Sequence, residues 1–155
     1  MAAGGVTMRG IFDFLLRRDT RRRTPRQETG RAGEQAAEAF LKKHGYRILD
    51  RNVTYRQGEV DLVAQEKATG TLCFVEVRSR AAPAGDRLPV QPEETVTLRK
   101  RRRIISATRK FLADRRVMDV TVRFDVIAIR FDGDDRRRPD IRHYPAAFDA
   151  NGRLT

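Results

Sequence analysis

Cysteine is almost missing from this chain: Cys73 stands alone among 155 residues. A single cysteine excludes an internal disulfide, so we expect a protein of a reducing compartment. Cys73 lies in an apolar stretch, where a free thiol usually packs as a small core residue.

Long hydrophobic runs are missing as well. No run approaches the roughly 20 apolar residues that a helix needs to cross a bilayer. The apolar stretch at residues 11–16 is short and contains Asp13, unlike the hydrophobic core of a secretion signal. We therefore expect a cytoplasmic protein.

Several common catalytic and ligand-binding motifs are absent. His44 and His143 lie far apart, and no cysteine or histidine stands near either at zinc-ligand spacing. The sequence contains no Walker or dinucleotide-binding glycine pattern and no Gly-x-Ser-x-Gly turn. These absences exclude the usual zinc, nucleotide and serine-hydrolase signatures.

Basic residues outnumber acidic ones. Lys and Arg number 33 against 21 Asp and Glu, a net charge of +12 with a sequence pI near 11.0. Such an excess favours encounter with polyanions, so nucleic acid is the leading partner. A membrane surface, an acidic protein and a generally basic proteome are the alternatives.

The composition predicts three parts. Residues 1–27 form a basic leader that repels itself and is expected to be disordered without a partner. The leader also carries an apolar set at residues 11–16 that suits a membrane surface or the domain itself. Residues 28–148 form one domain, and residues 149–155 form a short tail.

Periodicity and turn residues predict an α/β domain. Helices are expected at residues 30–44 and 94–116, and strands at 60–65, 71–80 and 120–131; residues 46–49 and 52–55 predict a strand or an edge pair. Residues 81–93 are rich in proline and predict a loop, and residues 141–144 predict a last short strand. The order is α-β-β-β-α-β, a mixed β-sheet flanked by helices.

Two strands carry acids where a core strand would be apolar. Asp61 shares a face with Val63, and Glu76 shares a face with Phe74. A hairpin turning at residues 69–70 would place Asp61 and Glu76 level with each other. An ionised carboxylate inside a fold is costly unless it is paired or coordinated. The pair therefore predicts a site for Mg²⁺ or Mn²⁺, the ions that suit phosphodiester hydrolysis.

Other charged residues extend this prediction. Arg78 would face the charge that develops on a phosphoryl group, although a surface ion pair with Glu76 is an equal alternative. Glu34 lies at the border of the first helix's apolar face, where a solvated side chain is the default. Lys100 and Arg101 belong to the basic run at residues 99–103 of the second helix, for which a solvated face and a phosphate contact are equal alternatives. Arg101 falls on the apolar face of this helix, so it must pair with an acid or emerge at the site.

Several segments together resemble the bacterial YraN-like family (UPF0102). They are residues 30–36 (GRAGEQA), 45–49 (GYRIL), 56–64 (RQGEVDLVA), 74–80 (FVEVRSR), 100–101, 124–127 (FDVI) and 143–148. This family is assigned to the restriction-endonuclease-like fold and is similar to Holliday-junction resolvases of the PD-(D/E)xK superfamily. The resemblance implies that Glu34 matches a helix glutamate, and that Asp61 and Glu76 match the two strand metal ligands.

The sequence departs from the superfamily motif at one position. The motif ends in lysine, and Arg78 stands there. Arginine keeps the charge and can bind phosphate, but it does not lose its proton to act as a base. We hypothesise that Lys100 or Arg101 reaches in from the second helix to replace the lysine.

The resulting first interpretation is a metal-dependent nuclease-like protein that acts on structured or branched DNA. Asp61 and Glu76 would bind the ion, and Glu34 and Arg78 would complete the catalytic set. Nucleic-acid contacts are expected from Arg56, Arg80, Lys100 and Arg101. A homodimer follows only by analogy with junction-cutting enzymes. The alternatives are a non-catalytic nucleic-acid-binding module with the same fold, and a basic scaffold that docks through its leader.

Overall fold

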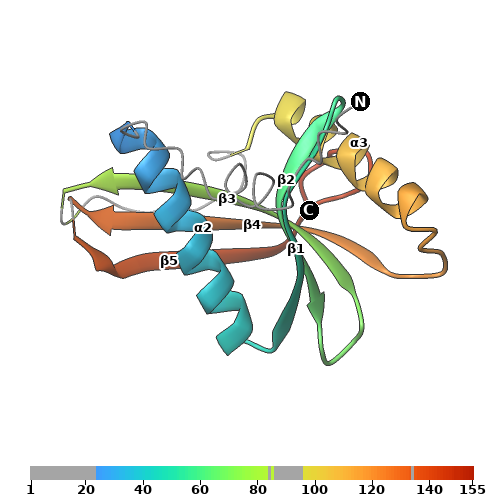
Figure 1. The fold of residues 1–155 in the computed structure, drawn as a ribbon, viewed down its shortest axis with the longest axis horizontal. Coiled ribbons are helices and arrows are strands. Elements are labelled where there is room, and N and C mark those ends of the chain that lie inside the picture. Colours follow the sequence, from blue (N-terminus) through green and yellow to red (C-terminus); the bar gives the residue numbers. More distant parts are fainter. Residues whose placement is uncertain (1–23, 84, 86–95, 134) are drawn as a thin grey trace, which may run out of the picture.

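A mixed five-stranded sheet organises the computed structural model of the chain, which describes residues 24–83, 85, 96–133 and 135–155 (Figure 1). The strands, in sheet order, are β1 (Tyr46–Tyr55), β2 (Gly58–Glu66), β3 (Leu72–Ala82), β4 (Val122–Asp132) and β5 (Asp135–Phe148). Neighbours are antiparallel except β3 and β4, which are parallel. Two helices, α2 (Pro25–Lys43) and α3 (Leu98–Asp114), accompany the sheet. The predicted α/β class is confirmed, and the arrangement is consistent with a restriction-endonuclease-like core.

Helix α2 begins five residues before the predicted start, inside the segment expected to be a leader. The Thr24 hydroxyl accepts a hydrogen bond from the Gln27 backbone N–H at 3.3 Å, and the Gln27 side chain accepts one from the Thr24 N–H at 3.0 Å. This capping box, together with proline in the first turn, fixes the helix start. The rest of the predicted leader, residues 1–23, lies outside the described residues.

Helix α3 connects the two parallel strands. Parallel neighbours require a crossover, and α3 lies in the connection from β3 to β4. The Thr97 hydroxyl caps the helix by accepting the Lys100 backbone N–H at 3.3 Å. The helix is shorter than the one predicted at residues 94–116. Of the predicted loop, residues 81–82 belong to β3, and residues 84 and 86–93 lie outside the described part of the chain.

Strand β5 is much longer than the predicted last strand at residues 141–144. It has 14 residues and pairs with β4 along most of that length. Its first half is basic and contains Pro139, a composition that does not suggest a strand. An edge strand tolerates both features because one of its sides has no neighbour in the sheet.

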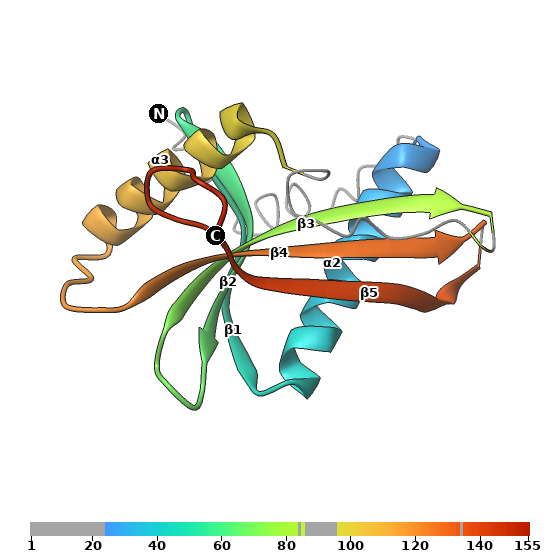
Figure 2. The ribbon, with the colours of Figure 1, turned by 180° about the vertical axis from the view of Figure 1, so that it is seen from behind.

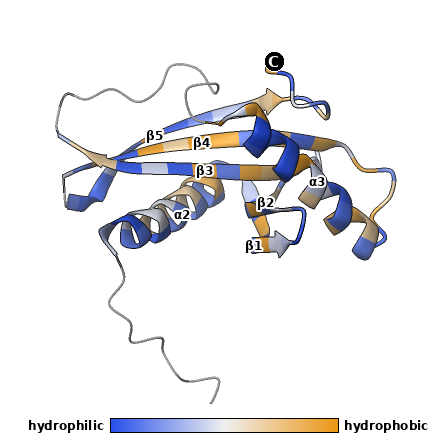
Figure 3. Ribbon diagram, turned by 90° about the horizontal axis from the view of Figure 1, so that it is seen from above, coloured by the Kyte–Doolittle hydropathy of each residue, from blue (hydrophilic) through white to orange (hydrophobic). Residues whose placement is uncertain are grey.

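Two hydrophobic clusters use alternate residues of the same strands. Val63 and Phe74 belong to the cluster under α3, whereas Leu62 and Val75 belong to the cluster under α2. Successive strand residues face opposite sides, so the helices cover opposite faces of the sheet. Seen from behind, β3, β4 and β5 lie in front of α2 (Figure 2). Hydrophobic residues gather in the middle of β4 and in the first half of β3, as burial on both faces requires (Figure 3). Neither described helix is long and apolar enough to cross a membrane.

Candidate functional site

Asp61 and Glu76 meet where β2 and β3 separate. The last paired residues of these strands are Leu62 and Val75, and Asp61 and Glu76 are the next residues on each strand. The Asp61 carboxylate oxygen Oδ2 accepts a hydrogen bond from the backbone N–H of Val77 at 2.7 Å. The Asp61 side chain thus accepts the Val77 N–H, which the separation of β2 from β3 leaves without a strand partner. The structure brings the two acids together as the hairpin register predicts.

Burial makes this pair of acids electrostatically costly. Glu76 is 2% exposed, and its Oε2 atom lies 3.3 Å from Lys100 Nζ but makes no well-aligned hydrogen bond within the described residues. Burial, followed by the negative charge of Asp61, raises the pKa of Glu76 to about 8. The pKa of Asp61 is also raised, chiefly by burial. The metal-free pair therefore holds its protons more tightly than free carboxyl groups do, and a cation bound between the two acids would favour their release.

Lys100 supplies a cation from helix α3. Its Nζ lies 2.8 Å from Glu59 Oε1 and 3.3 Å from Glu76 Oε2. Burial lowers the pKa of Lys100, but the hydrogen bond to Glu59 and the charges of Glu76 and Asp61 outweigh it, so the pKa lies above its ordinary value. Lys100 is accordingly a fixed positive charge and a proton donor, and not a base at neutral pH.

The packing of α3 on the start of β2 determines where Lys100 stands. A Cβ at Gly58 would lie 2.3 Å from the backbone oxygen of Arg103, so the helix approaches the strand as closely as a glycine permits. The first turn of α3 then lies beside Glu59 and Glu76. The absence of a side chain at Gly58 is what brings the lysine to the acids.

The two other cations named by the sequence occupy different positions. Arg78 is 51% exposed on its side chain, and its NH1 lies 3.7 Å from Glu76 Oε1. Because Glu76 is buried, this contact is not a surface ion pair. Arg101 is 8% exposed, and within the described part of the chain its Nε and Nη1 atoms have no hydrogen-bond partner. No described acid pairs with it, and of the two candidate replacements it is Lys100 that contacts the acids.

Glu34 approaches the acids from the other helix. Burial and then the charge of Asp61 raise the pKa of Glu34, and a hydrogen bond with the Asn52 side chain opposes these effects. Glu34 and Asn52 line a cavity of about 420 Å³ between α2 and the first two strands. Two further predicted contacts, Arg56 in the β1–β2 turn and Arg80 on β3, are exposed.

The carboxylates of Asp61 and Glu76 suit a metal ion that takes its remaining ligands from water and substrate. Within the described ranges, no group of three or more histidine, cysteine, aspartate or glutamate side chains is arranged to enclose a metal. Mg²⁺ typically takes one or two carboxylates and keeps waters or substrate phosphates as its remaining ligands. Glu76 Oε2 has only an ion-pair contact with Lys100 among the described residues, and Glu76 is repelled by Asp61; both features fit that kind of site.

Sequence reasoning missed two residues of this site. One is Glu59, which lies two residues before Asp61 on β2, so the strand alternation that placed Asp61 also pointed to it. Asn52 gave no signal, because its place depends on a left-handed backbone (φ 50°) near an irregularity in the pairing of β1 with β2. No residue pattern indicated that irregularity.

A second buried acid has a structural explanation. Asp125 is 0% exposed and accepts hydrogen bonds from Arg123 Nε at 2.8 Å, from His143 Nε2 at 2.9 Å and from the Ala146 N–H at 3.0 Å. Burial alone would raise its pKa, but these bonds lower it. Since its partners lie on β4 and β5, Asp125 ties these strands together and needs no cation from solution.

Comparisons with known proteins agree on one family. The family model described as "Uncharacterised protein family UPF0102" matches residues 33–129. A UPF0102 protein of Anaeromyxobacter dehalogenans is 45% identical over 128 residues, covering 83% of this chain and 89% of that protein. UPF0102 proteins of Syntrophotalea carbinolica and Myxococcus xanthus are 40% and 41% identical, over 82% and 81% of this chain and 96% and 92% of theirs.

Proposed function

This chain belongs to the UPF0102 family, and from that membership and its site we propose that it is a metal-dependent nuclease-like protein. The proposed reaction is hydrolysis of phosphodiester bonds in structured or branched DNA. The observation that carries the proposal is the buried acid pair Asp61 and Glu76 beside the cation Lys100, in a strongly basic protein. Clusters of perturbed acids of this kind are typical of catalytic sites.

Asp61 and Glu76 are the residues that would hold Mg²⁺ or Mn²⁺. An ion bound there supplies neutralisation of the phosphate charge and an activated water. Glu76 must be ionised to serve as a ligand, and Lys100 favours that ionised form because its ammonium lies 3.3 Å away.

The remaining residues act on the substrate. Arg78 is exposed beside Glu76 and would bind a phosphate oxygen, which suits its planar guanidinium. The ammonium of Lys100 would stabilise charge that develops on the phosphoryl group. Glu34 would accept a proton from a water in the adjoining cavity. Arg56 and Arg80 would contact the DNA backbone, and a homodimer would present two such sites to a branched substrate.

One observation favours a second candidate function, a nucleic-acid-binding module without catalysis. Lys100 already provides a cation to Glu76 and Glu59, so the acid pair can persist in the fold without metal. The place of the superfamily lysine is taken by Arg78, which cannot lose its proton. A module of this kind would bind DNA through the same basic surface and leave it intact.

Cleavage assays separate these functions. The purified protein is incubated with labelled four-way junction, flap, single-stranded and duplex DNA, with Mg²⁺, with Mn²⁺ and with a chelator. We expect cleavage of branched DNA that stops in the chelator and falls at least about 100-fold in Asp61→Asn and Glu76→Gln. Binding without cleavage supports the module, and cleavage unchanged in both variants identifies a contaminating nuclease.

The lysine replacement has its own matched test. We expect Lys100→Ala to abolish cleavage, and Arg78→Lys to preserve it. Arg109→Ala, which removes a cation from the exposed side of the same helix, should leave cleavage unchanged. Full activity in Lys100→Ala would remove this lysine from the mechanism. Loss of DNA binding only on deletion of residues 1–27 would favour a scaffold that docks through its leader.

A further inference from the structure

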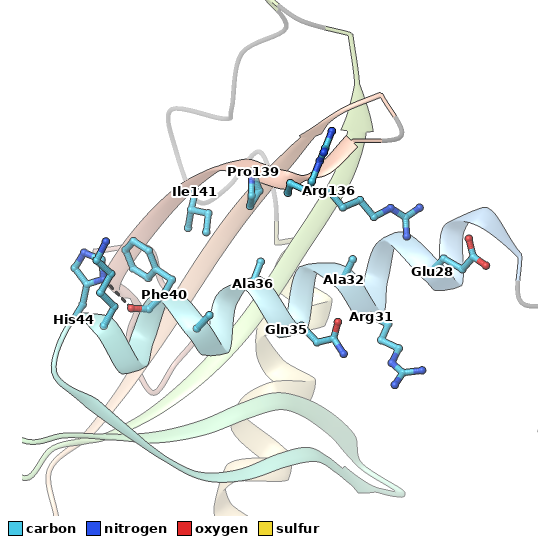
Figure 4. A pocket seen from close by; sticks show the side chains of 13 residues that line it. Glu28, Arg31, Ala32, Gln35, Ala36, Phe40, His44, Arg136, Pro139 and Ile141 are labelled. Atoms are coloured by element: carbon cyan, nitrogen blue, oxygen red, sulfur yellow. Dashed lines mark hydrogen bonds between the residues drawn. The ribbon is translucent and has the colours of Figure 1, made fainter. Parts of the chain in front are cut away.

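A second hollow lies on the side of α2 turned toward β5, and the acid site does not use it. The groove has a volume of about 820 Å³ (Figure 4). Ala32, Ala36 and Phe40 face it from the helix, and Pro139 and Ile141 face it from the strand. Its floor is therefore mostly aliphatic. It runs beside α2 from residue 28 to residue 44, a helix length of about 24 Å.

The rim of the groove is basic. Arg31, Lys43, Arg136 and Arg137 line it, and Glu28 is the acid among its lining residues. Arg31 points away from β5 in Figure 4 and also lines the cavity that contains Glu34. Lys43 and Arg137 are exposed. An apolar floor between cations complements a ligand that has apolar side chains in its centre and carboxylates along its edges.

We propose that this groove is a docking site for a short acidic amphipathic helix of a partner protein. Apolar side chains at one face of that helix would occupy the floor formed by Ala32, Ala36 and Ile141. Its aspartates and glutamates would pair with the rim cations. Arg31 and Gln35 line both this groove and the cavity near Asp61, but Glu34 and Asn52 line only that cavity, so a helix docked over Ala32, Ala36 and Ile141 leaves the acids open.

The chemistry of the floor disfavours a nucleic acid as the occupant. Single strands bind where bases stack on available aromatic faces. Phe40 is the aromatic ring of the floor, and His44 stacks on it with ring centroids 3.9 Å apart and an interplanar angle of 25°. Alanine, proline and isoleucine offer a base no stacking surface. The aliphatic floor instead matches the apolar face of a peptide helix.

Charge disfavours the chain's own leader as the occupant. Residues 11–16 are apolar enough to enter the groove, but a cluster of arginines follows them at positions 17, 18, 21, 22 and 23. These cations would be brought against Arg31 and Arg137, and like charges at close range repel. A partner with carboxylates beside its apolar face does not incur that repulsion.

Peptide binding to the full-length protein tests the proposal. The probe is a fluorescein-labelled helix-forming peptide of roughly 16 residues, with leucines at every third or fourth position and glutamates beside them. Its controls are a scrambled peptide of the same composition and a thymidine single strand of the same length. Fluorescence anisotropy should show the patterned peptide binding at least about 10-fold tighter than the scramble, with weakening at high salt.

Adjacent arginines of β5 provide a matched pair of variants. Arg137→Glu, on the rim, should weaken peptide binding at least about 10-fold, and Arg138→Glu, which does not line the groove, should leave it unchanged. Ala36→Glu, which puts a carboxylate on the floor, should also abolish binding. Asp61→Asn should bind the peptide normally, which separates this site from the proposed nuclease function. Circular dichroism verifies that each variant is folded.

Three outcomes would overturn the proposal. The first is equal affinity for the patterned and scrambled peptides, or equal effects of Arg137→Glu and Arg138→Glu. The second is tight binding of the thymidine strand that Ala36→Glu abolishes, which would assign the groove to nucleic acid. The third is a gain of peptide affinity in full-length Phe12→Asp, because that result would make the chain's own leader the occupant.

Discussion

The protonation of Glu76 should make the metal-free protein less stable as the pH rises through neutrality. Its pKa is raised from the ordinary 4.5 to about 8 by burial and by the charge of Asp61. The folded state thus binds this proton more tightly than the unfolded state. The resulting stabilisation is fully present below about pH 4.5 and is lost as the pH rises toward 8.

The size of this effect follows from the two pKa values. Each unit of difference corresponds to about 1.4 kcal/mol, so a rise from 4.5 to about 8 corresponds to about 5 kcal/mol. Small domains have free energies of unfolding of about 5–15 kcal/mol, so the change is a large fraction of the total. Glu38, whose pKa is lowered to about 2, acts in the opposite direction but at lower pH.

Urea denaturation in a chelator between pH 5 and pH 8.5 measures the effect. The free energy of unfolding should fall by several kcal/mol for the natural protein and stay nearly flat for Glu76→Gln, whose amide does not titrate. Glu28→Gln, at an exposed position on α2, should behave as the natural protein. Mn²⁺ should restore stability, more at pH 8 than at pH 6, since it binds the ionised pair.

Two results would refute this reasoning. The first is a stability curve for the natural protein that is flat or rising from pH 5 to pH 8 in the chelator. The second is a slope that persists unchanged in Glu76→Gln, because the titrating group would then lie elsewhere. Either result would mean that Glu76 is ionised in the metal-free fold and that Lys100 compensates its charge fully.

The remaining predictions concern stability. Gly58→Ala should cost at least about 1–3 kcal/mol in urea denaturation, because its Cβ would lie 2.3 Å from the Arg103 oxygen. Gly30→Ala, with nothing within 4 Å of its added Cβ, should be neutral or stabilising, and equal losses in both variants would contradict the packing argument. Asp125→Ala should cost about 3–5 kcal/mol, because it removes the buried acceptor of Arg123 Nε, His143 Nε2 and the Ala146 N–H, although Glu66 remains paired with Arg123; a loss below about 1 kcal/mol would show that water satisfies the network.

Strand alternation was sufficient to find the acid pair. Asp61 and Glu76 could be placed level with each other because a two-residue period and a turn at residues 69–70 define a hairpin register. The same period could not show that the strands separate at that level. Separation depends on the Asp61 side chain taking the Val77 N–H, which is a tertiary contact.

Sequence periodicity could not predict where α3 lies relative to the sheet. A helical wheel placed Arg101 on the apolar face, and it is buried there as that face requires. The wheel could not choose between Lys100 and Arg101 as the cation at the acids, because the choice depends on how α3 crosses β2. The predicted strand at residues 141–144 was shorter than β5 because the first half of β5 is polar and contains Pro139. An edge strand tolerates both features, but in a single sequence they indicate a loop.

Gly33 shows how a residue without a functional group can control the spacing of the acid site. A Cβ at that position would lie 2.4 Å from Ser79 Cβ, so α2 rests directly on β3. Any larger residue would lift the helix, and Glu34, the next residue, would be carried away from Asp61. The Ser79 hydroxyl holds the same contact closed by donating to the Thr29 carbonyl at 3.1 Å. The spacing of the acid site thus depends partly on the close backbone contact at Gly33. A substitution there would disturb the site while every charged residue of the sequence stays unchanged.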